Sequence, residues 1–60
     1  MTSGRPIYIE FVQQGNFIKA TAIDSATGVE ASIVGPASAP QSTLAEAARR
    51  KLEYVLKKKS

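Results

Sequence analysis

The first part of the chain alternates apolar and polar side chains with the two-residue period of a β-strand. Ile7, Ile9 and Phe11 share one side of the stretch 7–14. The stretch 17–24 repeats the alternation, with Ile18, Ala20 and Ala22 on one side. Between the two stretches, Gly15-Asn16 suits a hairpin turn of type II′, which favours glycine at its first central position. The pattern therefore predicts two paired strands, with Gln14 opposite Phe17.

A second turn is expected at Asp24–Gly28. Aspartate can accept bonds from donors two or three residues further on, and Gly28 tolerates the positive φ that ends such a loop. The chain then returns as a third strand over residues 29–34. Pairing Asp24 with Val29 places Ala31 opposite Ala22, on the face that the first turn also assigns. Because two independent turns agree on one face, we predict an antiparallel meander.

The last third of the chain changes to a helical period. Residues 35–40 are rich in proline and small residues and predict a linker. Thr43 followed by Glu46 matches a capping box, although Pro40 could start the helix up to two residues earlier. The apolar positions with helical spacing are Leu44, Ala45, Ala48, Leu52, Val55 and Leu56. We expect this helix to fray by Lys58 or Lys59.

These elements predict an α+β fold: a three-stranded antiparallel β-meander followed by one C-terminal α-helix packed on one sheet face (β-β-β-α). Residues 1–6 are expected to form a flexible arm, residues 7–58 a single domain, and residues 59–60 a frayed tail. The helix is expected to cover Ile7, Ile9, Phe11, Ile18, Ala20, Ala22, Val29, Ala31 and Ile33.

The opposite sheet face is more apolar than a solvated face usually is. A large exposed apolar patch normally marks a binding site, although isolated surface hydrophobic residues are also common. We predict that two copies associate here, side by side or with exchanged elements, and that Tyr8 and Phe17 anchor the contact. The predicted self-association face comprises Tyr8, Val12, Phe17, Thr21, Ile23 and Val34.

The composition argues against catalysis. The 60 residues include no Cys, His or Trp, and the five carboxylates are scattered singly along the chain. Glu10 and Glu30 would lie on the two edge strands, with the central strand between them. We therefore predict a protein that is not an enzyme and that binds no cofactor or metal. A third hypothesis, ranked below the others, is an enzyme whose catalytic groups come from a partner. No apolar run is long enough to span a membrane, and the lack of cysteine suits the cytoplasm.

The positive charge gathers near the carboxyl end. Residues 41–60 carry six basic and two acidic side chains, whereas residues 1–40 carry two basic and three acidic ones. An alternative function is therefore nucleic-acid binding by the basic C-terminal helix. The candidate anion-binding residues are Arg49, Arg50, Lys51 and Lys57. Glutamates at i,i+4 spacing explain much of the same pattern as a solvated helix face, so we favour self-association.

Several segments are similar to a known family. They are Ile7–Phe11, Gly15–Lys19, Ala22–Asp24 with Thr27-Gly28, Ile33–Pro36 and Arg50–Leu56. Through them the chain resembles a family of short uncharacterised alphaproteobacterial proteins, a domain of unknown function. The resemblance covers nearly the whole chain and implies a self-contained bacterial domain. Since that family has no assigned activity, it implies no functional residue.

Overall fold

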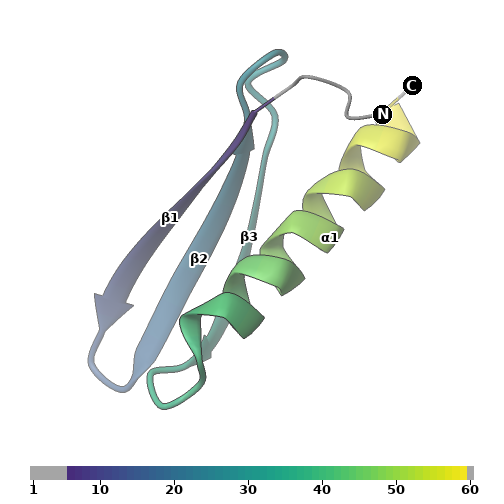
Figure 1. Ribbon diagram of the computed structural model, residues 1–60. Coiled ribbons are helices and arrows are strands. Elements are labelled where there is room, and N and C mark those ends of the chain that lie inside the picture. The colour runs from purple at the N-terminus through teal and green to yellow at the C-terminus, as the bar shows by residue number, and fades with distance from the viewer. Residues whose placement is uncertain (1–5, 60) are drawn as a thin grey trace.

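The computed structural model describes residues 6–59 and contains one sheet and one helix (Figure 1). Three antiparallel strands follow one another in the sheet: β1 (Ile7–Gln14), β2 (Phe17–Asp24) and β3 (Glu30–Pro36). The helix α1 (Gln41–Lys59) then packs on one face of that sheet. This order confirms the predicted β-β-β-α fold.

Both turns have the chemistry that the sequence predicted. Gln14 pairs with Phe17, and Gly15 has a φ of +61° while, among residues 6–59, no residue other than glycine has a positive φ, as a type II′ turn requires. Gly28 has a φ of +78°. The carboxylate of Asp24 is fully buried and accepts bonds from the Ala26 amide at 3.2 Å and the Thr27 hydroxyl at 2.9 Å. These local bonds hold the strands in the predicted register.

The start of the helix differs from the capping-box prediction. α1 begins at Gln41, and the Pro40 carbonyl accepts bonds from the amides of Thr43 at 3.1 Å and Leu44 at 3.3 Å. The capping box is therefore wrong, because Thr43 already lies inside the first turn, and the earlier start after Pro40 is correct. β3 also continues to Pro36, beyond its predicted end at Val34, and so takes up part of the expected linker.

The core lies between α1 and the second and third strands. Its buried apolar side chains are Ile18, Ala20, Ala22, Ala31, Leu44, Ala48 and Leu52. Figure 1 shows α1 running beside β3, with β1 on the far side of β2. The helix packs chiefly on β3 and β2 and barely reaches β1. The prediction that it covers all three strands is therefore wrong for Phe11, which stays 36% exposed.

Alanine explains where the helix lies. Ala20, Ala22 and Ala31 are at most 6% exposed, and their small side chains let the helix approach β2 and β3 closely. Gly35 of β3 is also buried, and the close approach of the helix requires glycine there, since a Cβ atom would lie 2.5 Å from Leu44 Cδ2. In β1 the residues paired with Ala22 and Ala20 are the bulky Ile9 and Phe11, and the helix makes few contacts with this strand.

The predicted ends of the domain are described only in part. Residues 1–5 of the predicted arm and residue 60 of the predicted tail lie outside the described residues. The carbonyl of Pro6 accepts a bond from the Ser25 amide at 3.3 Å, which ties the start of β1 to the turn between β2 and β3. At the other end, the helix continues through Lys59.

Candidate self-association surface

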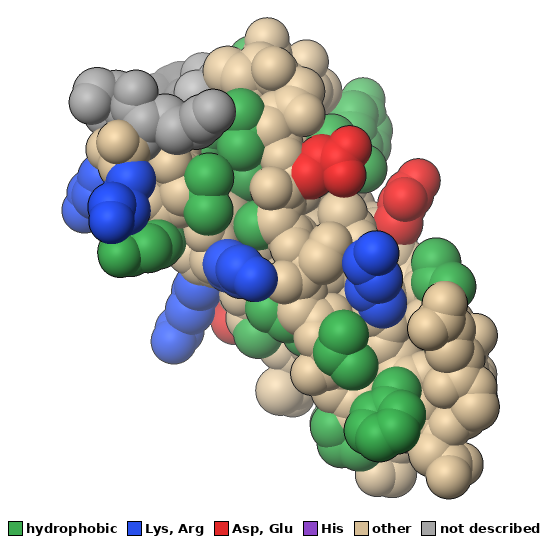
Figure 2. Space-filling model, turned by 180° about the vertical axis from the view of Figure 1, so that it is seen from behind, with side chains coloured by type: hydrophobic (Ala, Val, Ile, Leu, Met, Phe, Trp, Pro, Cys, Tyr) green, Lys and Arg blue, Asp and Glu red, His purple; other side chains and the backbone are tan. Residues whose placement is uncertain are grey.

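The outer face of the sheet, opposite α1, keeps most of its predicted apolar residues in solvent. Tyr8 is 58% exposed, Val12 48%, Phe17 58% and Val34 65%. Figure 2 shows hydrophobic side chains interspersed with charged ones on the side turned away from the viewer in Figure 1. The structure thus places four of the six predicted self-association residues where a partner could contact them.

Thr21 and Ile23 contribute less to this surface. Thr21 is only 9% exposed, because it lies in the central strand between Glu10 of β1 and Ser32 of β3. The hydroxyls of Thr21 and Ser32 share a hydrogen bond of 2.8 Å. Ile23 is half-buried. Both side chains therefore expose less surface to a partner than the other four predicted residues.

One carbonyl on the edge of β3 is bonded by the chain itself. The Asp24 amide donates to the Val29 carbonyl at 2.9 Å, and because bonding alternates along an antiparallel pair, the Ser32 carbonyl points to the free edge. Lys51 reaches over from α1 and donates to that carbonyl at 2.8 Å. A lysine on an exposed strand edge is a common protection against pairing with another chain.

The edge of β1 is open by comparison. Within residues 6–59, no group of the chain bonds to the outward amides and carbonyls of this strand. Glu10 is the one charged residue among the eight residues of β1. This edge was not predicted, because Phe11 was expected to lie in the core; the clustering of the alanines on β2 and β3 was the signal in the sequence that could have revealed it.

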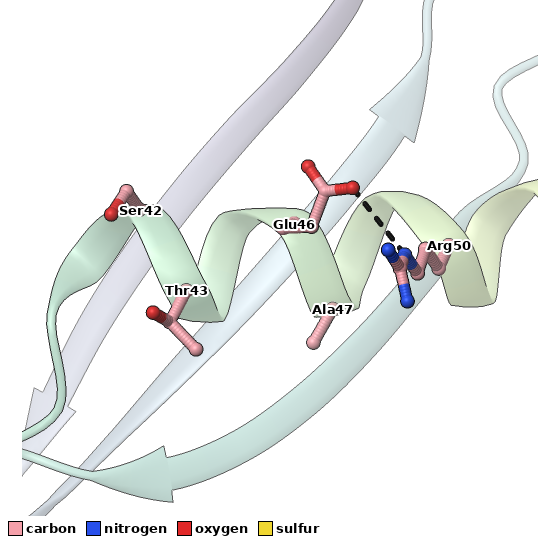
Figure 3. A pocket seen from close by; sticks show the side chains of 5 residues that line it. All are labelled: Ser42, Thr43, Glu46, Ala47 and Arg50. Atoms are coloured by element: carbon pink, nitrogen blue, oxygen red, sulfur yellow. Dashed lines mark hydrogen bonds and ion pairs between the residues drawn. The ribbon is translucent and has the colours of Figure 1, made fainter.

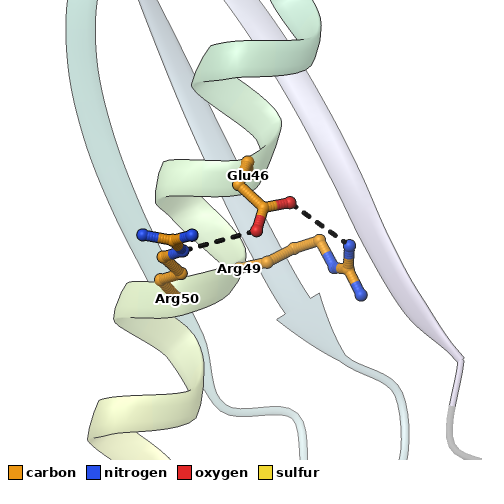
Figure 4. Close-up of polar contacts among 3 residues, drawn as sticks. All are labelled: Glu46, Arg49 and Arg50. Carbon is orange, nitrogen blue, oxygen red and sulfur yellow. Dashed lines mark hydrogen bonds and ion pairs between the residues drawn. The ribbon is translucent and has the colours of Figure 1, made fainter.

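The predicted anion-binding residues do not form one cluster. Glu46 lies between Arg49, at 3.7 Å, and Arg50, at 3.3 Å, and pairs with both (Figure 4). Lys51 turns the other way, to the edge of β3. Lys57 lies almost two helical turns beyond Arg50 and also makes a contact of its own. The basic side chains are therefore separated: Glu46 pairs with two of them, Lys51 lies on another side of the helix, and Lys57 lies further along the helix axis.

A hollow of about 570 Å³ lies along α1 (Figure 3). Its lining residues are Ser42, Thr43, Glu46, Ala47 and Arg50. All five come from one helix, and the Glu46–Arg50 ion pair already engages its charged groups. Small-molecule sites are usually lined by several elements with convergent polar groups, and this hollow lacks that construction.

Two further kinds of feature are absent from residues 6–59. This part of the chain holds no group of three or more acidic, histidine or cysteine side chains placed to bind a metal ion. It also holds no helix with the length and apolarity needed to cross a membrane.

Fold and surface together define the class of protein: a small α+β domain in which Lys51 bonds to one sheet edge, the other edge is open, and exposed apolar side chains lie among polar ones on the outer face. The chain belongs to the family described as "Domain of unknown function (DUF6898)", which matches residues 4–59. This match confirms the domain of unknown function that the sequence resemblance implied. No curated protein and no solved structure is significantly similar to the chain.

Proposed function

We propose that this protein is a small non-enzymatic interaction module that acts as a homodimer. The observation that carries the proposal is the exposure of Tyr8, Val12, Phe17 and Val34 on one face of the sheet. Exposed apolar patches on small soluble domains usually mark interaction surfaces, and aromatic residues contribute most to the binding energy of such surfaces.

The small core supports association with a second copy. A chain of 60 residues buries only about 60% of the surface that its unfolded form exposes. Four of the seven buried apolar residues are alanines, which contribute little apolar area each. Since the sequence has no cysteine for a disulfide, contact with another chain is the available source of further stability.

Other parts of the proposal rest on the sequence. The absence of His and Cys supports a non-enzymatic role, since these residues supply most acid–base and nucleophilic groups near neutral pH. The resemblance to alphaproteobacterial proteins supports a bacterial source. The cysteine-free composition is compatible with the reducing cytoplasm, where we place the module.

The test of the proposal is the mass of the protein in solution. At about 50 µM we expect sedimentation equilibrium to give a dimer of about 13 kDa, twice the 6.4 kDa of one chain. A 6.4 kDa monomer that persists at millimolar concentration would contradict the homodimer.

A matched pair of substitutions locates the contact. Tyr8→Glu places a charge on the outer sheet face, and Tyr54→Glu places the same charge on an equally exposed tyrosine of α1 (58% and 61% exposed). We expect Tyr8→Glu alone to shift the equilibrium toward monomer, because the charge would be desolvated at the contact. Equal effects of the two substitutions would show that the outer face of β1 takes no part.

A further inference from the structure

The direction of the backbone groups on β1 follows from its hairpin. The two-residue turn makes Gln14 and Phe17 a hydrogen-bonded pair, so every second residue of β1 counted back from Gln14 bonds to β2. The amides and carbonyls of Ile9, Phe11 and Gln13 therefore point away from the sheet. They form a ready template for another strand, on an edge that no residue from 6 to 59 covers.

The side chains of β1 favour the same conclusion. On the inner face, Ile7 and Ile9 are half-buried and Phe11 is 36% exposed, because α1 lies over the other two strands. On the outer face, Tyr8 and Val12 are exposed. The strand thus offers apolar surface on both sides of its open edge, whereas on the edge of β3 the Lys51 ammonium bonds to the Ser32 carbonyl.

We propose that two copies of the chain join through their β1 edges, antiparallel, with the two-fold axis passing beside Phe11 and perpendicular to the sheet. The inference rests on the proposed homodimer and identifies its contact. Strands related by such an axis place opposing residues on the same face of the joined sheet. Both helices then lie on one side, and the space above the two β1 strands is floored by Ile9 and Phe11 of each copy.

Charge selects the register. An axis at Glu10 would put two carboxylates directly opposite each other, which is destabilising. An axis at Phe11 instead puts Glu10 opposite Val12 of the second copy. Val12 is itself paired with Lys19, so each Glu10 lies on the same face as a lysine of the other copy, one strand further on. An axis at Ile9 would put Glu10 opposite Tyr8 of the second copy. Tyr8 is paired with Ile23, so this register places no cation in the same row as Glu10.

The same register joins the outer faces. Tyr8 comes to lie opposite Gln14 of the second copy, and Gln14 is paired with Phe17. The two predicted aromatic anchors therefore share one row across the joined sheet, on either side of the dimer contact. A second copy of the chain therefore occupies the open edge, sets the two Phe11 side chains next to each other on the inner face, and gives Tyr8 a neighbour, Gln14, on the outer face.

Single-cysteine variants test the axis, because the chain has no cysteine of its own. Opposing Cα atoms of a hydrogen-bonded antiparallel pair lie about 5.5 Å apart, within the range of a disulfide. Phe11→Cys should therefore link to its own copy under mild oxidation. Ile9→Cys should not, since its two copies would be four residues apart along the strand, about 13 Å. Glu10→Cys tests the remaining axis.

Tyr54→Cys, on the exposed surface of α1, measures linkage by chance collision. At about 50 µM protein we expect Phe11→Cys to form covalent dimer about a hundredfold faster than Tyr54→Cys, since paired thiols face an effective concentration in the millimolar range. Equal rates, or preferred linkage at residue 9 or 10, would overturn the inference. If the unsubstituted protein is still a dimer in that case, the proposed function stands without this contact; a monomer would remove both.

Hydrogen exchange of the unsubstituted protein gives a second test that needs no variant. Raising the concentration through the dimerisation range should slow exchange of the Ile9, Phe11 and Gln13 amides about tenfold or more, because these amides become bonded between the copies. The outward amides of Ser32 and Val34 on β3 serve as the control and should not change. Slowing on the β3 edge alone, or on neither edge, would contradict the pairing of β1.

Discussion

Leu52 is the side chain on which the packing of α1 depends most. It is 0% exposed and, with Asp24, is one of the two largest fully buried side chains. Leu52→Ala removes apolar carbon from the contact between helix and sheet, worth about 0.8 kcal/mol for each buried methylene, and leaves a cavity that adds to the cost. Measured substitutions of this kind lower the free energy of unfolding by about 2–5 kcal/mol.

That loss is large for this domain. A single core in a chain of this length supplies only about 3–5 kcal/mol of net stability. Leu52→Ala should therefore leave much of the protein unfolded at room temperature, because the core has no other large aliphatic side chain at the centre of the helix. The substitution tests the position of the helix as well as the size of the core.

Circular dichroism during thermal and urea unfolding measures the effect. The comparison is made at one protein concentration, since self-association makes the melting temperature depend on concentration. Tyr54→Ala, two residues further along the same helix but 61% exposed, is the control and should change stability by less than about 1 kcal/mol, the size of an exposed contact such as that of its ring with Lys58 Nζ at 5.5 Å. A melting temperature of Leu52→Ala within a few degrees of the parent protein would show that another face of α1 is buried.

Two further predictions concern the close approach at β3 and the basic helix. Gly35→Ala should lower the free energy of unfolding by about 1–3 kcal/mol through overpacking against Leu44, and by much less when Leu44→Ala is combined with it, as a double-mutant cycle of urea melts can show. Fluorescence anisotropy should detect no complex with duplex or single-stranded nucleic acid at about 150 mM salt, because Glu46 pairs with both Arg49 and Arg50; submicromolar binding abolished by alanine at residues 49–51 would contradict this.

The strands and their register could be predicted from the sequence because local chemistry determines them. Gly15 and Gly28 supply the positive φ angles of the two turns, and Asp24 bonds to donors two and three residues further on. Each turn determines which residues are paired, and a shift by one residue would also move the apolar side chains to the wrong face. The apolar spacing around Leu52 likewise determined which side of the helix is buried.

The candidate site was predictable only in part. The alternation of apolar and polar residues predicted that Tyr8 and Phe17 are exposed on the outer face. Thr21 lies on the same face but is buried, because it belongs to the central strand and bonds to Ser32. The capping box at Thr43 was wrong because a preceding residue starts the helix. The Pro40 carbonyl accepts the first helical hydrogen bonds, so Thr43 already lies within the helix. Exposure and capping both depend on neighbours that a periodic pattern does not identify.

The position of the helix on the sheet was decided by tertiary packing alone. The width of the apolar face of α1 shows that the helix can cover two of the three strands, but it does not determine which two. The small side chains of Ala20, Ala22 and Ala31, together with Gly35, admit the helix over β2 and β3. That placement lets Lys51 bond to the Ser32 carbonyl on the β3 edge and leaves Phe11 and the edge of β1 open. The local sequence thus determined the strands, whereas close packing between distant residues determined which edge of the sheet the helix reaches.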